Sequence, residues 1–509
     1  MTDTAASTPG PAEESTVRPV AHPAAELAGA PASAPAADPL APYDAVLLLS
    51  YGGPRRSEDV LPFMRNATAG RGVPDSRLLE VSGHYQGFGG ASPINACNAE
   101  LRDALQARLA EHGSTLPIVI GNRNWHPFVS QALRELADAG ARRVLALPTA
   151  AFGSYSGCRQ YREDLAGAIA LLADGADGST GEGFEADAAA RVGGDGGAPV
   201  ELTVDKTRPY YNSSGLLQAN VDAIVEAYGR LAEQGVSAAD VRLVLVTHSI
   251  PLGMETGSAP TPESDGASDS AGAGQPAGRP AGPREPGVAA DLSTEVSYVA
   301  QHRALAAILV PEVARRLGLE EVESDLVYCS RSGPPQARWL EPDVNDHLEA
   351  LAAGQLIDGS PADRPGGVVV APFGFISDHM EVVFDLDTEA AQTARDLGMP
   401  YARAATVGTH PAFVDSLVDI LIERAAVARG EDVHPASTTG VGPFHTVCPP
   451  SCCRSGAHHP GQHSHHGADG AAHESAAGHQ LAAGGSCRPA SAEPESLKPA
   501  SCGRMKEKR

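Results

Sequence analysis

The chain has 509 residues and a formal net charge of −25 at pH 7. This excess of acidic residues argues against a nucleic-acid partner, because binding to the phosphate backbone is driven by clustered lysine and arginine. No apolar run approaches the roughly 20 residues that cross a bilayer, and the N-terminus lacks the basic start and apolar centre of a signal peptide, so we expect a cytoplasmic protein that is not an integral membrane protein.

Both ends of the chain have the composition of disordered tails. Residues 1–43 are dominated by Ala, Pro, Glu, Ser and Thr, and residues 431–509 are rich in Gly, Ala, Ser and His. Such segments bury too little apolar surface to offset the conformational entropy lost on ordering. Two internal stretches, at about 174–197 and 257–287, are rich in small and acidic residues, and we expect disordered insertions in surface loops there. The rest should form one compact unit of two sub-domains.

Six short apolar runs, rich in β-branched residues and bounded by Gly, Pro or Ser, predict buried parallel strands. They lie at residues 45–49, 117–120, 143–147, 242–246, 325–328 and 367–371. Longer segments of helical periodicity lie between them or follow them, at 95–112, 128–139, 216–234, 297–317, 344–353 and 388–397. Strands that alternate with helices predict an α/β fold with parallel sheets and right-handed crossovers.

Polar residues that follow the predicted strands are candidate site residues, because ligands of open α/β sheets bind beyond the carboxyl ends of the strands. These are residues 50–52, 122–126, 154–158, 247–251, 330–333 and 373–381. Among them, His248 follows a hydrophobic strand in Val-Thr-His-Ser-Ile-Pro, where a near-neutral imidazole can accept a proton or bind a metal. The alternative is a histidine that only caps the strand end.

Three carboxylates follow at a spacing of four residues: Glu381, Asp385 and Glu389. On a helix this spacing predicts one acidic stripe. Like charges along one face stabilise a helix poorly, but they suit the transfer of a hard divalent cation or of protons along a path. The alternative is a solvated helix face.

Four of the eight cysteines suggest a metal centre. Cys158 lies after the third predicted strand, and Cys448, Cys452 and Cys453 form a compact group beyond the last predicted helix. Four thiolates suit either a 2Fe–2S cluster or zinc, and spacing alone does not choose between them. Cys487 and Cys502 lie further along the C-terminal extension and could replace one of these ligands.

Several separated motifs, in order along the chain, give it a family resemblance. They are Leu-Leu-Ser-Tyr-Gly-Gly-Pro (48–54), Gly-Gly-Ala-Ser-Pro-Ile (89–94), the His248 segment, Trp-Leu-Glu-Pro-Asp-Val (339–344) and the Glu381 segment. From 44 to about 428 the sequence resembles the ferrochelatases. The resemblance implies two Rossmann-like sub-domains, one of 44–150 plus 401–428 and one of 151–400, with a porphyrin cleft between them.

The resemblance also implies roles for individual residues. His248 and Glu381 match the active-site histidine and its acidic partner, which share the delivery of Fe²⁺ and the removal of two pyrrole protons. Asp385 and Glu389 extend this acidic path. The porphyrin contacts match Tyr51, Ser92 and Arg71. Where some relatives have two adjacent arginines this chain has Ala69 and Gly70 before Arg71, and Asn124 replaces a histidine found in many relatives.

The actinobacterial character of the motifs implies coproporphyrin III as the substrate, with protoporphyrin IX as the alternative. Actinobacterial relatives also imply that Cys158, Cys448, Cys452 and Cys453 bind a 2Fe–2S cluster. We expect a monomer with transient contacts to neighbouring enzymes of the haem pathway. The His-rich extension and the cysteines motivate a different hypothesis, a metal-storage or iron–sulfur scaffold protein. The Trp339 and Glu381 segments argue against a sirohydrochlorin or cobalt chelatase.

Overall fold

The computed structural model describes residues 37–70, 72–174, 200–258, 297–331, 337–448 and 452–454. Residues from Asp38 onward form one unit, and all that follows concerns this unit. Most of the segments expected to be disordered, the His-rich part of the C-terminal extension, Arg71, Cys487 and Cys502 lie outside the described residues. The N-terminal expectation is wrong at its end, because Leu40 and Tyr43 are buried in the core.

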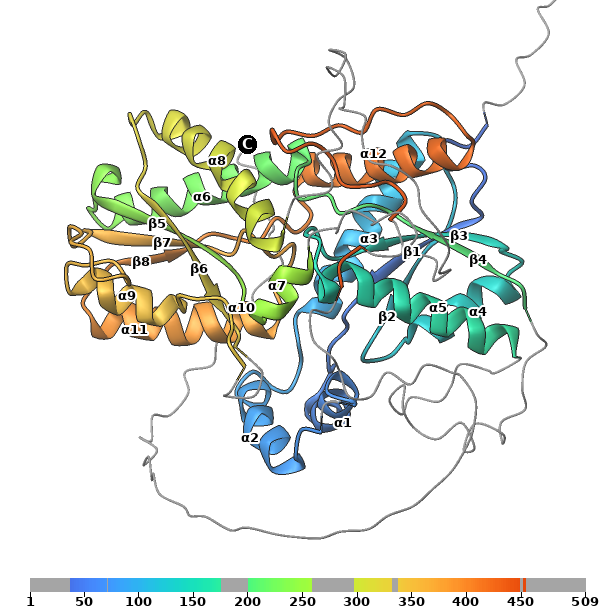
Figure 1. Ribbon diagram of the computed structural model, residues 1–509, viewed down its shortest axis with the longest axis horizontal. Helices are drawn as coiled ribbons and strands as arrows, with labels where there is room; N and C mark the ends of the chain where they lie inside the picture. Colours follow the sequence, from blue (N-terminus) through green and yellow to red (C-terminus); the bar gives the residue numbers. More distant parts are fainter. Residues whose placement is uncertain are drawn as a thin grey trace, which may run out of the picture. The chain divides into compact units, whose positions relative to one another are not determined.

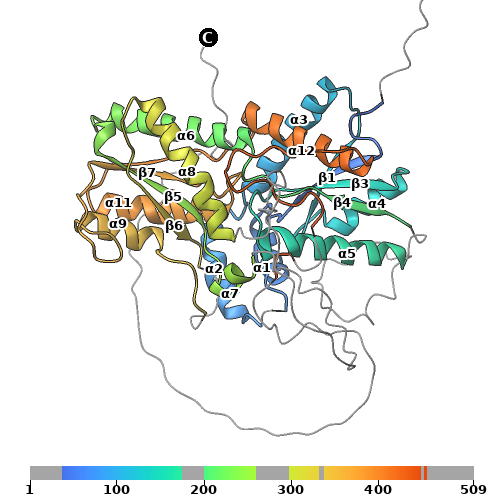
Figure 2. The same cartoon turned by 45° about the horizontal axis from the view of Figure 1, so that its top comes forward.

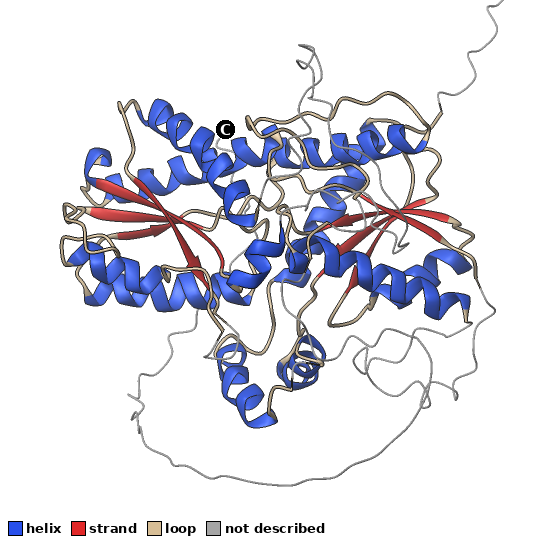
Figure 3. Cartoon of the chain, in the orientation of Figure 1, coloured by secondary structure: helices blue, strands red, loops and turns tan. Residues whose placement is uncertain are grey.

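Two four-stranded parallel sheets form the centre of the two halves (Figures 1 and 3). The first sheet has the order β2-β1-β3-β4 and consists of β1 (Ala45–Ser50), β2 (Ile118–Asn122), β3 (Arg143–Pro148) and β4 (Thr203–Lys206). The second has the order β6-β5-β7-β8 and consists of β5 (Val241–His248), β6 (Ser324–Cys329), β7 (Gly367–Ala371) and β8 (Tyr401–Arg403). The α/β fold predicted from the sequence is confirmed, and the two halves share one strand order.

Helices cover both faces of each sheet (Figure 1). Over the first sheet lie α3 (Ile94–Glu111) and α12 (Pro411–Ala428) on one face and α4 (Val129–Asp138) and α5 (Gln160–Ala173) on the other. Over the second lie α6 (Ser214–Glu233) and α8 (Tyr298–Leu317) on one face and α9 (Val344–Ala352) and α11 (Ala391–Asp396) on the other. A hairpin of α1 (Val60–Ala67) and α2 (Asp75–Gln86) projects from the first half. Shorter elements are η1 (Ser57–Asp59), η2 (Tyr155–Arg159), η3 (Ala238–Asp240), α7 (Leu252–Ser258), α10 (Met380–Phe384) and η5 (Asp385–Ala390).

The central strands are apolar throughout because both of their faces are covered. In β1, Leu47 and Leu49 pack with α4 and α5, whereas Val46 and Leu48 face the opposite core. That opposite core is continuous across both halves and contains residues of α3, α6, α8 and α12. The turned view in Figure 2 shows α6 and α12 side by side where the halves meet.

The boundary expected at residue 150 differs from the structure. β4 pairs with β3 and therefore belongs to the first sheet, and β8 pairs with β7 in the second. Both strands are short, at four and three residues, and carry polar side chains, so they lack the apolar run that marked the other six. Among the described residues, no helix is both long and apolar enough to span a bilayer.

Candidate active site

A cavity of about 310 Å³ opens where the strands of both sheets end. Its walls include residues within three positions of the ends of β1, β2, β3, β5 and β7, as the sequence predicted for an α/β crevice. The volume lies at the lower end of the range for small-molecule sites. Five of the six candidate segments reach this cavity, and Ser330 and Arg331, the described residues of the sixth, do not line it.

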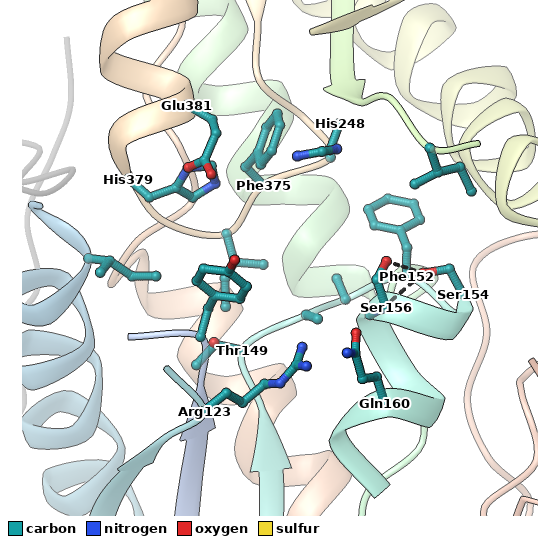
Figure 4. A pocket seen from close by; sticks show the side chains of 18 of the residues that line it. Arg123, Thr149, Phe152, Ser154, Ser156, Gln160, His248, Phe375, His379 and Glu381 are labelled. Atoms are coloured by element: carbon teal, nitrogen blue, oxygen red, sulfur yellow. Dashed lines mark hydrogen bonds and ion pairs between the residues drawn. The ribbon is translucent and has the colours of Figure 1, made fainter. Parts of the chain in front are cut away.

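The first half contributes a polar wall with one cation (Figure 4). Its labelled polar residues are Arg123, Thr149, Ser154, Ser156 and Gln160, and Phe152 adds an aromatic ring. The Arg123 side chain is 8% exposed and forms an ion pair with Asp164 of α5. Its guanidinium lies 5.8 Å from the ring centroid of Tyr51 and 4.9 Å from that of Tyr161. A guanidinium paired with a carboxylate therefore lies at this wall.

The second half contributes His248, His379 and Glu381 to the opposite wall (Figure 4). His248 Nδ1 lies 2.5 Å from the Ser249 carbonyl oxygen. Because a carbonyl only accepts, Nδ1 carries the proton and Nε2 has a free lone pair. Burial lowers the pKa of His248, which keeps this imidazole neutral.

Glu381 is held in its ionised form by a neighbouring imidazole. His379 Nδ1 lies 2.6 Å from the Glu381 carboxylate. Burial alone would raise the pKa of Glu381, but the charge and hydrogen bond of His379 lower it to about 2. Burial would lower the pKa of His379, and the same pairing raises it instead. The wall thus presents one neutral imidazole and one imidazolium–carboxylate pair.

The acidic stripe runs from this wall to the surface, but not along a regular α-helix. Glu381 lies in α10, and the backbone widens to a π-helical turn over η5, which carries Asp385 and Glu389. Burial raises the pKa of Asp385 to about 7, and the charges of Glu381 and Glu389 add to this effect although Ser330 donates a hydrogen bond to the carboxylate. The three carboxylates therefore remain electrostatic neighbours, with Glu389 exposed. π-Helical turns occur frequently at functional sites.

Two of the three expected porphyrin contacts line the cavity. Tyr51 follows β1 and packs edge-on against Phe63 at 6.2 Å. Ser92 is buried, and its backbone N–H donates to the Pro54 carbonyl. Arg71 is outside the described residues. Asn124 donates a side-chain hydrogen bond to the Tyr51 carbonyl, and so fixes the loop after β1.

Sequence reasoning did not single out several residues of the cavity. His379 and Arg123 lie in candidate segments, and the position of His379 two residues before Glu381 was the available signal. Phe63 and Tyr85 come from the α1–α2 hairpin, Met254 from α7 and Trp339 from a connecting segment. None of these four directly follows a strand, and although Trp339 opens one of the family motifs, only the tertiary structure places them in the site.

A second, small cavity gathers the four selected cysteines. Cys158, Cys448, Cys452 and Cys453 line it together with Arg159, Arg162 and Lys206. Cys452 Sγ lies 3.6 Å from Cys453 Sγ, and Lys206 Nζ lies 3.3 Å from Cys158 Sγ. Arg159 and Arg162 donate to the carbonyl oxygens of Cys452 and Cys448, each at 3.3 Å. Within the described ranges, no group of three or more metal-ligating side chains has the arrangement of a single metal-ion site.

Comparison with known proteins identifies the family. The family model described as Ferrochelatase matches residues 43–177 and 168–425. The chain belongs to the ferrochelatase family. This ferrochelatase is 42% identical over 421 residues to a coproporphyrin III ferrochelatase of Streptomyces coelicolor, which covers 82% of this chain and 96% of the relative. It is 37% identical over 415 residues to one of Tropheryma whipplei, covering 81% and 89%.

The name of a further relative does not state which porphyrin it uses. The protein named Ferrochelatase in Rhodopirellula baltica is 37% identical to this ferrochelatase over 414 residues, which cover 81% of this chain and 94% of the relative. Matches of this extent span both halves and the cavity between them. The chain is therefore a metal chelatase of haem biosynthesis, an enzyme whose metal substrate is Fe²⁺.

Proposed function

We propose that this ferrochelatase inserts Fe²⁺ into coproporphyrin III to give Fe-coproporphyrin III, with release of two protons. The names of the relatives from Streptomyces coelicolor and Tropheryma whipplei support this substrate. The observation that carries the proposal is the cavity, where a polar wall with Arg123 faces His248 and Glu381. Coproporphyrin III has four carboxylates, which favour cationic and hydrogen-bonding partners.

The two active-site side chains divide the chemistry by their protonation states. His248 is neutral with a free Nε2, which suits it to accept a pyrrole proton. Glu381 is ionised, which suits it to hold Fe²⁺ as it loses water. Each iron inserted replaces two pyrrole protons, so charge balances when both protons leave. Asp385 and Glu389 would carry iron or protons between Glu381 and the surface.

The porphyrin would lie between the two walls of the cavity. Tyr51 and Ser92 line the cavity and would contact the macrocycle and one carboxylate, with Arg71 as a further cationic contact. Family membership and this cavity favour an enzyme over the metal-storage or scaffold protein that the His-rich extension suggested. We also propose that the enzyme is a cytoplasmic monomer, and light scattering would measure its oligomeric state. Its contacts with neighbouring enzymes of the haem pathway would be transient, and crosslinking would detect them.

The substrate is tested by anaerobic assays with Fe²⁺ and, separately, coproporphyrin III and protoporphyrin IX. Loss of free-porphyrin fluorescence and growth of the metalloporphyrin spectrum report insertion. We expect a higher kcat/KM for coproporphyrin III. A higher value for protoporphyrin IX would overturn the substrate assignment but keep the chelatase, and insertion into neither would reopen the scaffold hypothesis.

We further propose that Cys158, Cys448, Cys452 and Cys453 bind a 2Fe–2S cluster. Four thiols from segments almost 300 residues apart gather at one small cavity, which supports a shared ligand. Four thiolates are the usual ligand set of a 2Fe–2S cluster, and they also suit zinc. Lys206, Arg159 and Arg162 supply positive charge, which suits a dianionic cluster. When bound, the cluster would fasten the C-terminal extension to η2.

Cys158→Ser tests the cluster. We expect the variant to lose the visible absorption, the acid-labile sulfide and the iron of anaerobically purified wild-type protein, and to unfold at a lower temperature because ligand binding contributes to folding. Cys329→Ser removes a buried free thiol elsewhere and should keep the colour. Stoichiometric zinc without sulfide in wild-type protein would contradict the cluster and assign the thiols to zinc.

A further inference from the structure

Three fully or nearly fully buried polar side chains form a closed ring of hydrogen bonds behind His248. Thr247 and His302 are 0% exposed and Tyr298 is 7% exposed. Thr247 Oγ1 lies 2.8 Å from both the Tyr298 hydroxyl and His302 Nε2, and His302 Nδ1 lies 2.7 Å from the Tyr298 carbonyl oxygen. Buried polar groups of this kind are costly unless every one is paired.

The chemistry of the partners determines the direction of each hydrogen bond. The Tyr298 carbonyl only accepts, so His302 Nδ1 donates and Nε2 must accept from the Thr247 hydroxyl. Thr247 Oγ1 then accepts from the Tyr298 phenol, whose proton also faces the His248 carbonyl oxygen at 3.1 Å. Burial lowers the pKa of His302 to about 3, so this imidazole stays neutral and the pattern holds at physiological pH.

The ring lies where three segments of the active site meet. Its phenol contacts the backbone of His248 at the end of β5. A Cβ atom on Gly374 would lie 2.2 Å from Thr247 Oγ1, so the loop that leads to Phe375 and Glu381 packs directly on this hydroxyl. The His302 ring stacks on Phe152 of the first half, with centroids 3.7 Å apart and planes 9° apart. The ring therefore contacts the backbone of His248, the loop that leads to Glu381, and the Phe152 ring of the first half.

We propose that Thr247, Tyr298 and His302 are positioning residues for iron insertion, which hold the His248 backbone at a fixed distance from the loop that carries Glu381. The inference rests on the proposed function, because it assigns His248 and Glu381 to the chemistry. Of the three, Tyr298 also lines the cavity, and none needs to touch the iron. Their effect is geometric, and misplacing a reacting group by about 1 Å can lower a rate about 100-fold.

The sharpest test compares two substitutions at one position. Thr247→Val keeps the shape of the side chain but removes the hydroxyl, which leaves His302 Nε2 and the Tyr298 phenol without their common partner. Thr247→Ser keeps the hydroxyl and loses one methyl group. Iron insertion is measured anaerobically with Fe²⁺ and coproporphyrin III. We expect Thr247→Val to lower kcat about tenfold or more with the porphyrin KM changed less than about twofold, and Thr247→Ser to restore most of kcat.

Two further variants separate positioning from general destabilisation. Tyr298→Phe removes the phenol hydroxyl and should also lower kcat, whereas Tyr228→Phe removes a buried hydroxyl of α6 that has no hydrogen-bond partner in the described part of the chain and should not. Rates are expressed per folded protein from thermal unfolding curves. Wild-type kcat in folded Thr247→Val, or equal losses in the Val and Ser variants, would overturn the positioning role alone. A wild-type protein that inserts iron into no porphyrin would instead overturn the proposed function and this inference with it.

Discussion

At the scale of single residues, the site depends on neighbours that set the protonation of two side chains. His248 is neutral because it is buried, and its Ser249 contact directs the free nitrogen away from its own backbone. Glu381, whose side chain is 37% exposed, stays ionised because His379 pairs with it. One fold thereby presents a base and an anion at the same wall, since local partners shift each pKa in a different direction.

His248→Ala should reduce iron insertion by at least about 100-fold, because general-base catalysis contributes factors of this size. Coproporphyrin binding, followed by the quenching of its fluorescence, should change little since the cavity remains. His434→Ala removes an imidazole that is 92% exposed and serves as the matched control. Normal turnover in His248→Ala would show that this imidazole takes no part in the reaction.

At the scale of elements, buried ion pairs connect the strands and helices that carry the site. Asp325 of β6 accepts from Arg242 of β5 at 2.6 Å and contacts His347 Nε2 of α9 at 3.0 Å. Burial alone would raise the pKa of Asp325, but these two partners lower it from 3.8 to about 2. The ion pair of Arg242 with Asp325 connects β6 to β5, the strand that ends at His248.

Asp325→Asn should destabilise the protein by about 2 kcal/mol at pH 7, since a lowered pKa contributes stability as long as the carboxylate is ionised. The folded pKa lies below the ordinary value, so this contribution is complete above about pH 4 and is lost as the pH falls towards 2. Urea unfolding of both proteins from pH 7 to pH 3 measures the difference. Asp363→Asn, at an exposed aspartate, should have little effect at any pH. If the difference in unfolding free energy between wild type and Asp325→Asn did not shrink in acid, the ionised Asp325 carboxylate would not be the source of this stability.

At the scale of the whole unit, the two halves are held together by a shared core and by the crossing of α6 and α12. Gly215 of α6 lies so close to α12 that a Cβ atom there would be 1.8 Å from the Ala412 carbonyl oxygen. Its N–H donates to Ser416 at 2.8 Å. Arg208 and Glu423 add a buried two-point ion pair at 2.7 and 2.9 Å. These contacts join α6 of the second half to α12 of the first half.

Gly215→Ala should therefore force the helices apart and destabilise the protein by about 1–3 kcal/mol, the usual cost of overpacking. Gly229→Ala lies on the same helix with no neighbour within 4 Å and should stabilise it by about 0.5–1 kcal/mol, since alanine favours helices. Denaturant midpoints measure both changes. Equal effects of the two substitutions would show that the close approach of α6 and α12 has no energetic consequence.

Six of the eight strands and the α/β class were predictable, because strands covered on both faces are apolar runs that alternate with amphipathic helices. His248, Glu381, Tyr51 and Ser92 were predictable from motifs, and each lines the cavity. The strands β4 and β8 were not predictable, since short strands at the edge of a sheet carry few apolar residues. Their absence from the prediction put the boundary between the halves in the wrong place.

What the sequence determined by itself is local or ordered along the chain: the periodicity of strands and helices, the strand ends where ligands bind, and the order of the family motifs. What only the tertiary structure decided is which distant side chains meet. The approach of Arg123 to Tyr51 and the buried ring of Thr247, Tyr298 and His302 depend on packing between segments that the sequence separates. Such contacts leave no periodic signal, because they are made by single residues whose neighbours come from other elements of the fold.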